Sequence, residues 1–422
     1  MHLSTLDKPR TAPGSTYKWI ILAVLWLTLL LSYFDRVAIA AALPFMSHDL
    51  HLSPSIAGLV SGALFLSYTI VQVPAGYLSD RFGQRRVIVA AIAWWTLFSV
   101  LTGVLSGSVL TLLIVRFLMG AGEGFHPPPL WRMMSNWFPA GRRALPLALM
   151  LTALPLGPAL APSIAFPIIR SLGWHWVFYV TAIPGILAVL LVARYLRDTP
   201  RYRDLVEPTS TSTATGPARP PRQWWVPHIW LTFLSFLFFG FVLYGLMGWL
   251  PTYLIKYRGL NLLHAGVFAT LPYVAGVVGM LLGAWICERR YNHLRRRFVA
   301  LTYLATAVCI ALTAIAPTVT LAGTFLTMAG FFLYSGLGPF WSVPMDVVRP
   351  HEVGMWLGFI NMGTQISGFL GPIIIGWLIQ VSGSFTPALV AMIVAMVLAA
   401  GCLSLVREKV TEAITPPAPV PA

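Results

Sequence analysis

The chain has 422 residues, of which 57% are hydrophobic and only 10% are charged. A mean hydropathy of +0.77 excludes an ordinary soluble enzyme. The net charge of +15 sits mainly in short loops between apolar segments, so no basic soluble face for nucleic acid is predicted. The three cysteines show no metal spacing, and no catalytic triad order or phosphate loop stands out. We therefore expect no cofactor, no metal site and no enzymatic activity.

Twelve apolar segments are long enough to span a bilayer, at about 20 residues per helix. The first is followed by eleven more, so we expect a retained span and not a cleaved signal peptide. A spanning segment must satisfy its own backbone amides, which favours helices. The sequence predicts an all-α membrane protein with twelve transmembrane helices, in chain order near 19–41, 55–78, 87–106, 109–130, 145–168, 175–196, 227–254, 264–286, 298–316, 319–345, 354–380 and 387–406.

The positions of the 28 Lys and Arg predict the topology. Most lie at the two termini and in alternate loops, so the positive-inside rule predicts that both termini are cytoplasmic. The expected location of the chain is the inner membrane of the cell. A polar segment rich in Pro, Ser and Thr is typical of a flexible connector. The predicted organisation is a cytoplasmic N-terminus at 1–18, a six-helix half at 19–196, a cytoplasmic linker at 197–225, a second six-helix half at 226–406 and a cytoplasmic tail at 407–422.

Four charged residues lie inside apolar segments: Asp35 and Arg36 in the first, and Arg116 and Glu123 in the fourth. A charge in hydrocarbon costs roughly 2.5 to 3.5 kcal/mol on insertion scales, so such residues usually face a bundle interior or a wet cavity. Acids and arginines together favour the transport of an anion with protons. The alternative is that Asp35–Arg36 and Arg116–Glu123 are static ion pairs that hold helices together.

The loop after the second segment runs from Gly76-Tyr77-Leu78-Ser79-Asp80-Arg81 to Phe82-Gly83-Gln84-Arg85-Arg86. These residues at these spacings resemble the loop motif of the major facilitator superfamily. This resemblance implies a tight glycine turn, an acid at the N-terminus of a neighbouring helix, and arginines that hold the cytoplasmic side closed through ion pairs. The equivalent loop at 283–290 is degenerate, because Glu288 stands in place of the aspartate and the second glycine is missing. The predicted gating residues are Gly76, Asp80, Arg81, Gly83, Arg85 and Arg86.

Within that superfamily the chain is similar to the anion:cation symporter family, which includes bacterial sugar-acid and aromatic-acid permeases and the animal sialin carriers. The resemblance covers nearly the whole chain and depends on the order and spacing of many short motifs. These include Tyr33-Phe34-Asp35-Arg36, Arg116 with Gly120 and Glu123, Trp137-Phe138-Pro139, Trp174-His175-Trp176, Trp249-Leu250-Pro251 and Phe340-Trp341.

The resemblance implies that Arg36 binds the substrate carboxylate through its planar fork. Tyr33 and Tyr68 would donate hydrogen bonds beside it, and the wall of the second half would include Tyr244, Trp341 and Asn361. The fifth segment lacks the amide side chain with which sugar-acid carriers hold hydroxyls. A site built for many hydroxyls would leave polar groups unpaired around an apolar acid, so a less hydroxylated anion is favoured.

The resemblance also implies that Asp35 and Glu123 are the protonatable acids, and that Arg116 pairs with one of them while the substrate is absent. Burial favours the neutral form of an acid and a nearby arginine favours the charged form, so a change of partner can move a proton. His126 lies one turn after Glu123 and could share its proton. Alternatively, His126 is a hydrogen-bonding residue at a helix end before three prolines.

The function predicted from the sequence is secondary active transport, namely symport of a small organic anion with protons by alternating access. The expected partners are this anion, protons and the lipid bilayer, with no nucleic acid, and the expected state is a monomer. The alternatives are a proton-coupled exporter of drug-like or siderophore-like compounds and a non-coupled facilitator. A sensor would require a larger cytoplasmic domain.

Overall fold

The computed structural model describes residues 15–138, 144–198, 227–291, 294–347 and 353–406. These residues form helices and no strand. Twelve of the helical segments are long and apolar enough to cross a membrane. The prediction of an all-α membrane protein with twelve spans is confirmed. Most of the predicted linker and the tail after residue 406 lie outside the described residues.

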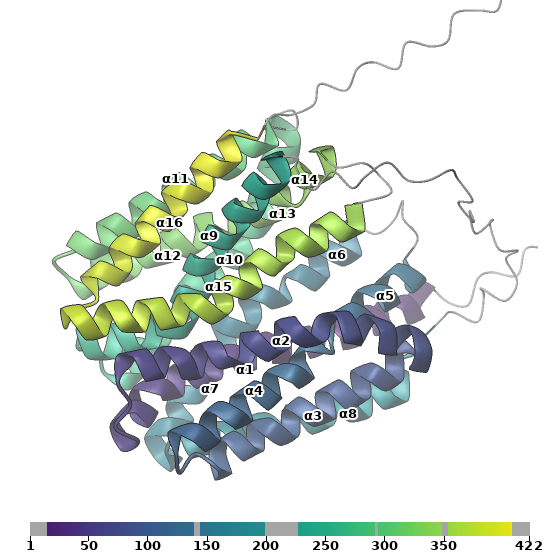
Figure 1. Cartoon of the computed structure of the whole chain (residues 1–422), viewed down its shortest axis with the longest axis horizontal. Helices are drawn as coiled ribbons and strands as arrows, with labels where there is room; N and C mark the ends of the chain where they lie inside the picture. The colour runs from purple at the N-terminus through teal and green to yellow at the C-terminus, as the bar shows by residue number, and fades with distance from the viewer. Residues whose placement is uncertain (1–14, 139–143, 199–226, 292–293, 348–352, 407–422) are drawn as a thin grey trace, which may run out of the picture.

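The helices divide into two halves, which lie one above the other in Figure 1. The first half contains α1 (Ser15–Asp49), α2 (Pro54–Phe82), α3 (Gln84–Val104), α4 (Val109–Gly124), α5 (Pro127–Trp137), α6 (Ala144–Leu151), α7 (Ala153–Leu172) and α8 (His175–Tyr195). The second half contains α9 (Pro227–Thr252), the π-helix η3 (Tyr253–Tyr257), α10 (Leu262–Arg290), α11 (Arg295–Ile315), α12 (Val319–Ser335), α13 (Leu337–Phe340), α14 (Ser342–Val347), α15 (Val353–Ser382) and α16 (Thr386–Ser404).

Prolines explain why some spans consist of two helices. The fourth span breaks between α4 and α5, where three prolines begin at Pro127 and remove three backbone donors. This span continues to Trp137, beyond the predicted end at residue 130. The first span also begins earlier than predicted, at Ser15. Apolar periodicity does not mark such ends sharply, because a helix can extend past the hydrocarbon region.

The two halves pack through three helix pairs, α2 with α15, α7 with α10, and α1 with α9. Hydrogen bonds join them from Ser55 N–H to Gln380 Oε1 at 3.3 Å and between the hydroxyls of Ser163 and Thr270 at 2.8 Å. Ser55 lies where α2 begins and Gln380 where α15 ends. These residues lie at the end of the molecule where α1 ends, opposite to the end where α1 begins.

Glycines let the backbones of α2 and α15 touch at this end. A side chain at Gly376 would overlap the carbonyl oxygen of Pro54, and one at Gly62 would overlap that of Phe369. The close approach leaves no space for a β-carbon on either helix. The two halves are therefore held together at one end by direct backbone contact.

Replacing Gly376 by valine should destabilise this contact. Overpacking of a tight interior typically costs about 1–3 kcal/mol, so the melting temperature of purified Gly376→Val in detergent should fall clearly below that of the wild type. Gly358→Val is the matched control, because it lies on the same helix and a β-carbon there meets no atom within 4 Å. Equal melting temperatures for the two variants would contradict the assigned contact.

Candidate functional site

A buried ion pair joins α1 to α4 inside the first half. Arg36 donates from Nε to Glu123 Oε2 at 2.9 Å, and the side chains are 4% and 0% exposed. The Ser32 hydroxyl donates to the same carboxylate oxygen at 3.0 Å. Ser32 precedes Arg36 by one helical turn, so both side chains project from the same face of α1. Two helices thus meet at one carboxylate.

Aromatic rings surround the Arg36 guanidinium. Its Cζ lies 4.7 Å from the ring centre of Tyr33, 4.8 Å from that of Tyr68 and 5.4 Å from that of Phe65. Such cation–π contacts stabilise a desolvated cation. From the second half, the ring of Tyr244 lies 4.4 Å from that of Phe65. The predicted site residues Tyr33, Tyr68 and Tyr244 are therefore brought together around Arg36 from three helices.

The pair does not use all of its hydrogen-bonding capacity. Arg36 Nη1 and Glu123 Oε1 are buried and have no hydrogen-bond partner among the described residues. Buried polar atoms are normally satisfied, so each unpaired one requires an explanation. A donor on the arginine and an acceptor on the acid are thus both available at the same place, which suits an anion and a proton respectively.

Arg116 does not form the expected ion pair. It is buried, and its Nη1 lies 3.1 Å from the sulfur of Met119, while its Nε has no partner. Within the described residues Arg116 forms no salt bridge, because Glu123 is already held by Arg36 from α1. Asp35 is also buried and has no hydrogen bond or ion pair there. The alternative of two static pairs, Asp35–Arg36 and Arg116–Glu123, is wrong because Arg36 pairs with Glu123 instead.

His126 lies at the break between α4 and α5 and is buried. Its Nε2 is 2.8 Å from the Thr28 hydroxyl on α1, and its ring meets Trp95 edge to face at 5.3 Å. Thr28 also donates to the Leu25 carbonyl at 2.7 Å. Since that hydroxyl has a single proton, His126 Nε2 is the donor in the bond between them. The imidazole makes no capping bond at α5; this residue at a helix end forms its hydrogen bond with α1 instead.

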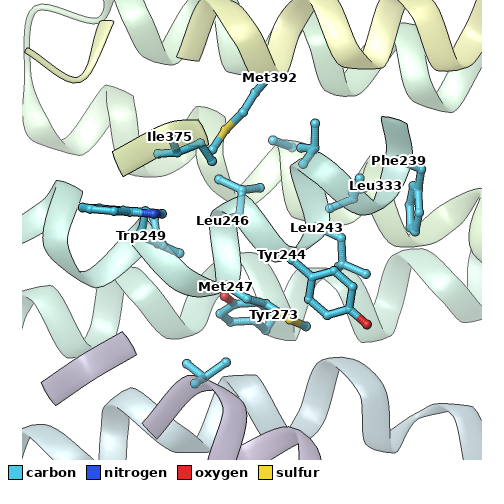
Figure 2. Close-up of a cluster of buried hydrophobic side chains, with 14 of the residues drawn as sticks. Phe239, Leu243, Tyr244, Leu246, Met247, Trp249, Tyr273, Leu333, Ile375 and Met392 are labelled. Carbon is cyan, nitrogen blue, oxygen red and sulfur yellow. The ribbon is translucent and has the colours of Figure 1, made fainter. Parts of the chain in front are cut away.

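The wall from the second half is more aromatic than polar. The Trp341 ring packs against Phe236 at 4.8 Å, and Phe236 stacks on Phe340 at 4.4 Å. Asn361 is partly buried on α15 with no side-chain hydrogen bond described. Figure 2 shows Tyr244 and Met247 on one side of α9, with Ile375 and Met392 on the other.

Sequence reasoning missed several polar residues. Ser32 could have been found from its spacing to Arg36. By contrast, the buried hydroxyls of Tyr273 and Tyr334 have no partner among the described residues. Isolated tyrosines in apolar helices give no sequence signal that separates a ligand-facing side chain from one in the core. No group of His, Cys, Asp or Glu suited to a metal was found in the part of the chain that the structure describes.

The gating loop differs from the expected arrangement. Gly76 lies within α2, and the turn is formed by Gly83, whose φ of +88° favours glycine. The acid at the N-terminus of α3 is Asp198, which accepts from the Arg85 N–H at 2.5 Å. Asp80 instead lies 3.7 Å from Arg132 of α5, with both side chains exposed. These contacts all lie within the first half.

The remaining arginines of this loop have separate surroundings. The Arg85 guanidinium donates to the Ala193 carbonyl of α8. Arg81 lies over the ring of Phe82 at 5.4 Å. Arg86 is exposed and makes no hydrogen bond or ion pair within the described ranges. In this conformation none of the three bridges the two halves there.

Comparisons with known proteins agree with the fold. The chain matches the Major Facilitator Superfamily over residues 25–372. It is 29% identical to the hexuronate transporter of Bacillus subtilis (strain 168), over 87% of this chain and 89% of that protein. It is 30% identical to the probable sulfoacetate transporter SauU of Cupriavidus necator, over 87% of this chain and 88% of that protein.

Among solved structures, a bacterial homolog of the human lysosomal transporter Spinster superposes with a TM-score of 0.76 at 20% identity, covering 93% of this chain and 97% of that one. The likeness extends over both six-helix halves, and the predicted resemblance to the anion:cation symporters is confirmed by the relatives. The chain therefore belongs to the Major Facilitator Superfamily and is a membrane transporter, not an enzyme.

Proposed function

We propose that this transporter is a symporter that carries a small organic carboxylate together with protons by alternating access. The observation that carries the proposal is the Arg36–Glu123 pair, with Arg36 Nη1 and Glu123 Oε1 left unpartnered. Relatives that transport hexuronates and sulfoacetate support an organic acid as substrate.

The coupling follows from competition for Arg36. A substrate carboxylate that takes the guanidinium fork weakens the bond to Glu123, which then lacks its cation in a buried site. A buried carboxylate without a cation favours its protonated form. Anion entry and proton entry are thereby linked. Asp35 serves as a second protonatable acid, and the buried Arg116 adds a positive charge on α4, the helix that carries Glu123.

His126 has a positioning role in this proposal. Its hydrogen bond to Thr28 holds the α4–α5 junction against α1, and its ring contact with Trp95 holds the junction against α3. If His126 instead shares a proton with Glu123, then His126→Gln should change the pH profile of uptake as well as its rate.

The proposed orientation places both termini in the cytoplasm of the inner membrane, as the Lys and Arg distribution indicates. The backbone contact at Gly62 and Gly376 then lies at the outer end, so we propose that the conformation described here is closed to the outside. In the opposite conformation, the gating loop would approach the second half and hold the cytoplasmic end closed.

The surroundings of Arg36 favour an acid with few hydroxyls. The helix that faces α1 is α7, and at Gly157 a side chain would overlap the backbone of Leu30 and Phe34. No polar side chain can be placed at this point of contact. Apart from the Glu123 carboxylate, the groups described around the guanidinium are the rings of two tyrosines and one phenylalanine, which suit a compact or partly apolar anion better than a polyol.

Replacing Arg36 by lysine should abolish most transport, because a point charge cannot reproduce the two-pronged carboxylate bond. We expect uptake of labelled sulfoacetate, a hexuronate or glucarate into proteoliposomes to fall at least about tenfold, the scale of a lost hydrogen bond to a charged group. Arg289→Lys is the control, since Arg289 lies over Trp285 in the second half, away from the site. Equal uptake by both variants would contradict the role of Arg36.

Replacing Glu123 by glutamine should separate exchange from accumulation. The amide keeps an oxygen acceptor for Arg36 and Ser32 but cannot take up a proton. Counterflow of labelled substrate between the two sides should persist, whereas accumulation driven by an inward proton gradient should disappear. Gradient-driven accumulation by Glu123→Gln would exclude this acid as the coupling site.

The same assay separates the alternatives. An exporter would accumulate substrate only when the gradient is reversed, and a facilitator would equilibrate substrate at any gradient.

A further inference from the structure

A groove of about 480 Å³ lies on the outer side of the first half, away from Arg36, between α2, α3 and α4. Its lining is almost entirely apolar, with Leu78 and Phe82 from α2 and Phe125 directly after α4. Its volume lies within the roughly 300–1,000 Å³ of ordinary ligand pockets. None of the residues assigned to substrate or proton binding lines it.

Small residues and one tryptophan shape the floor and the inner end of this groove. Ala90 of α3 and Ala121 and Gly122 of α4 line it, and a side chain at Gly122 would overlap the Trp94 ring. The Trp94 indole donates to the Leu118 carbonyl at 2.7 Å across the two helices. This bond fixes the ring, so the groove is built by packed elements and not by a loop.

A single charged residue, Arg86, lines the groove. It stands in the first turn of α3, about 12 Å along the helix from Trp94 at 1.5 Å per residue. Its guanidinium is exposed and has no hydrogen bond or ion pair within the described residues. Arg81 and Arg85 flank it, and the two nearby acids are engaged, Asp80 with Arg132 and Asp198 with the Arg85 N–H. The mouth of the groove therefore attracts an anion.

We propose that this groove binds a phospholipid with an anionic head group, whose phosphate lies at Arg86 and whose acyl chain lies along α3 toward Trp94. The lining belongs to membrane-spanning helices, so an occupant reaches it from the bilayer. The combination of one apolar channel and one basic end matches a molecule that has an anionic head and an apolar tail. The loop of Arg86 faces the cytoplasm in the proposed orientation, which assigns the lipid to the inner leaflet.

Native mass spectrometry of the full chain, with matched phosphatidylglycerol and phosphatidylcholine added, tests this site without any transport substrate. We expect phosphatidylglycerol to be retained more strongly than phosphatidylcholine by the wild type. Arg86→Gln should lower phosphatidylglycerol affinity about fivefold, the effect of one basic residue near a membrane surface. Arg290→Gln, at the matching loop of the second half, should leave it unchanged.

A second variant tests the apolar part of the groove. Ala90→Phe, or Ala90→Leu if the larger side chain prevents folding, should weaken retention of both lipids while Arg86 remains in place. Equal losses in Arg86→Gln and Arg290→Gln would overturn the proposal, because they indicate a general surface charge effect. Unchanged retention of both lipids by the Ala90 variant would overturn the proposal as well. Neither result depends on whether the chain is a proton symporter.

Discussion

The bond between Arg36 and Glu123 imposes the main constraint on this structure, because it keeps a cation and an anion where water is almost absent. Neither charge tolerates that position alone. α1 and α4 must therefore stay in register, and Ser32 adds a second bond to the same carboxylate. The rings of Tyr33, Phe65 and Tyr68 cover the guanidinium, so the first half carries the charges and the second half adds Tyr244 beside them.

The same constraint connects packing with transport. A buried pair that is complete would act only as a structural link, but this one leaves a donor and an acceptor without partners. The glycine contacts between α2 and α15 hold the two halves together at one end of the molecule. A carrier needs both features, namely a charged site that can change partner and an interface that can form and separate without rearranging either half.

Much of this could be predicted from the sequence, because intramembrane charges are rare enough to identify a site on their own. Arg36 and Glu123 were found in this way, and the twelve spans followed from length and hydropathy. The partner of each charge could not be predicted, since spacing along one helix does not determine which neighbouring helix lies opposite. Arg116 was therefore paired incorrectly. The glycine turn was predicted from the motif, and Gly83 forms it. Asp80 was placed at a helix terminus by the same motif, whereas Asp198 has that position and is 113 residues from Arg85 in the chain.

The central claim is that substrate and Glu123 compete for Arg36, so that binding an anion makes the protein take up protons. It is tested most directly by adding a transported acid to purified protein in weakly buffered detergent solution and following a pH indicator. The account predicts net proton uptake by the wild type on binding and none by Glu123→Gln, with the bound amount measured in parallel by calorimetry. Binding by the wild type without proton uptake would contradict it, and would leave the Arg36–Glu123 pair as a structural link between two helices.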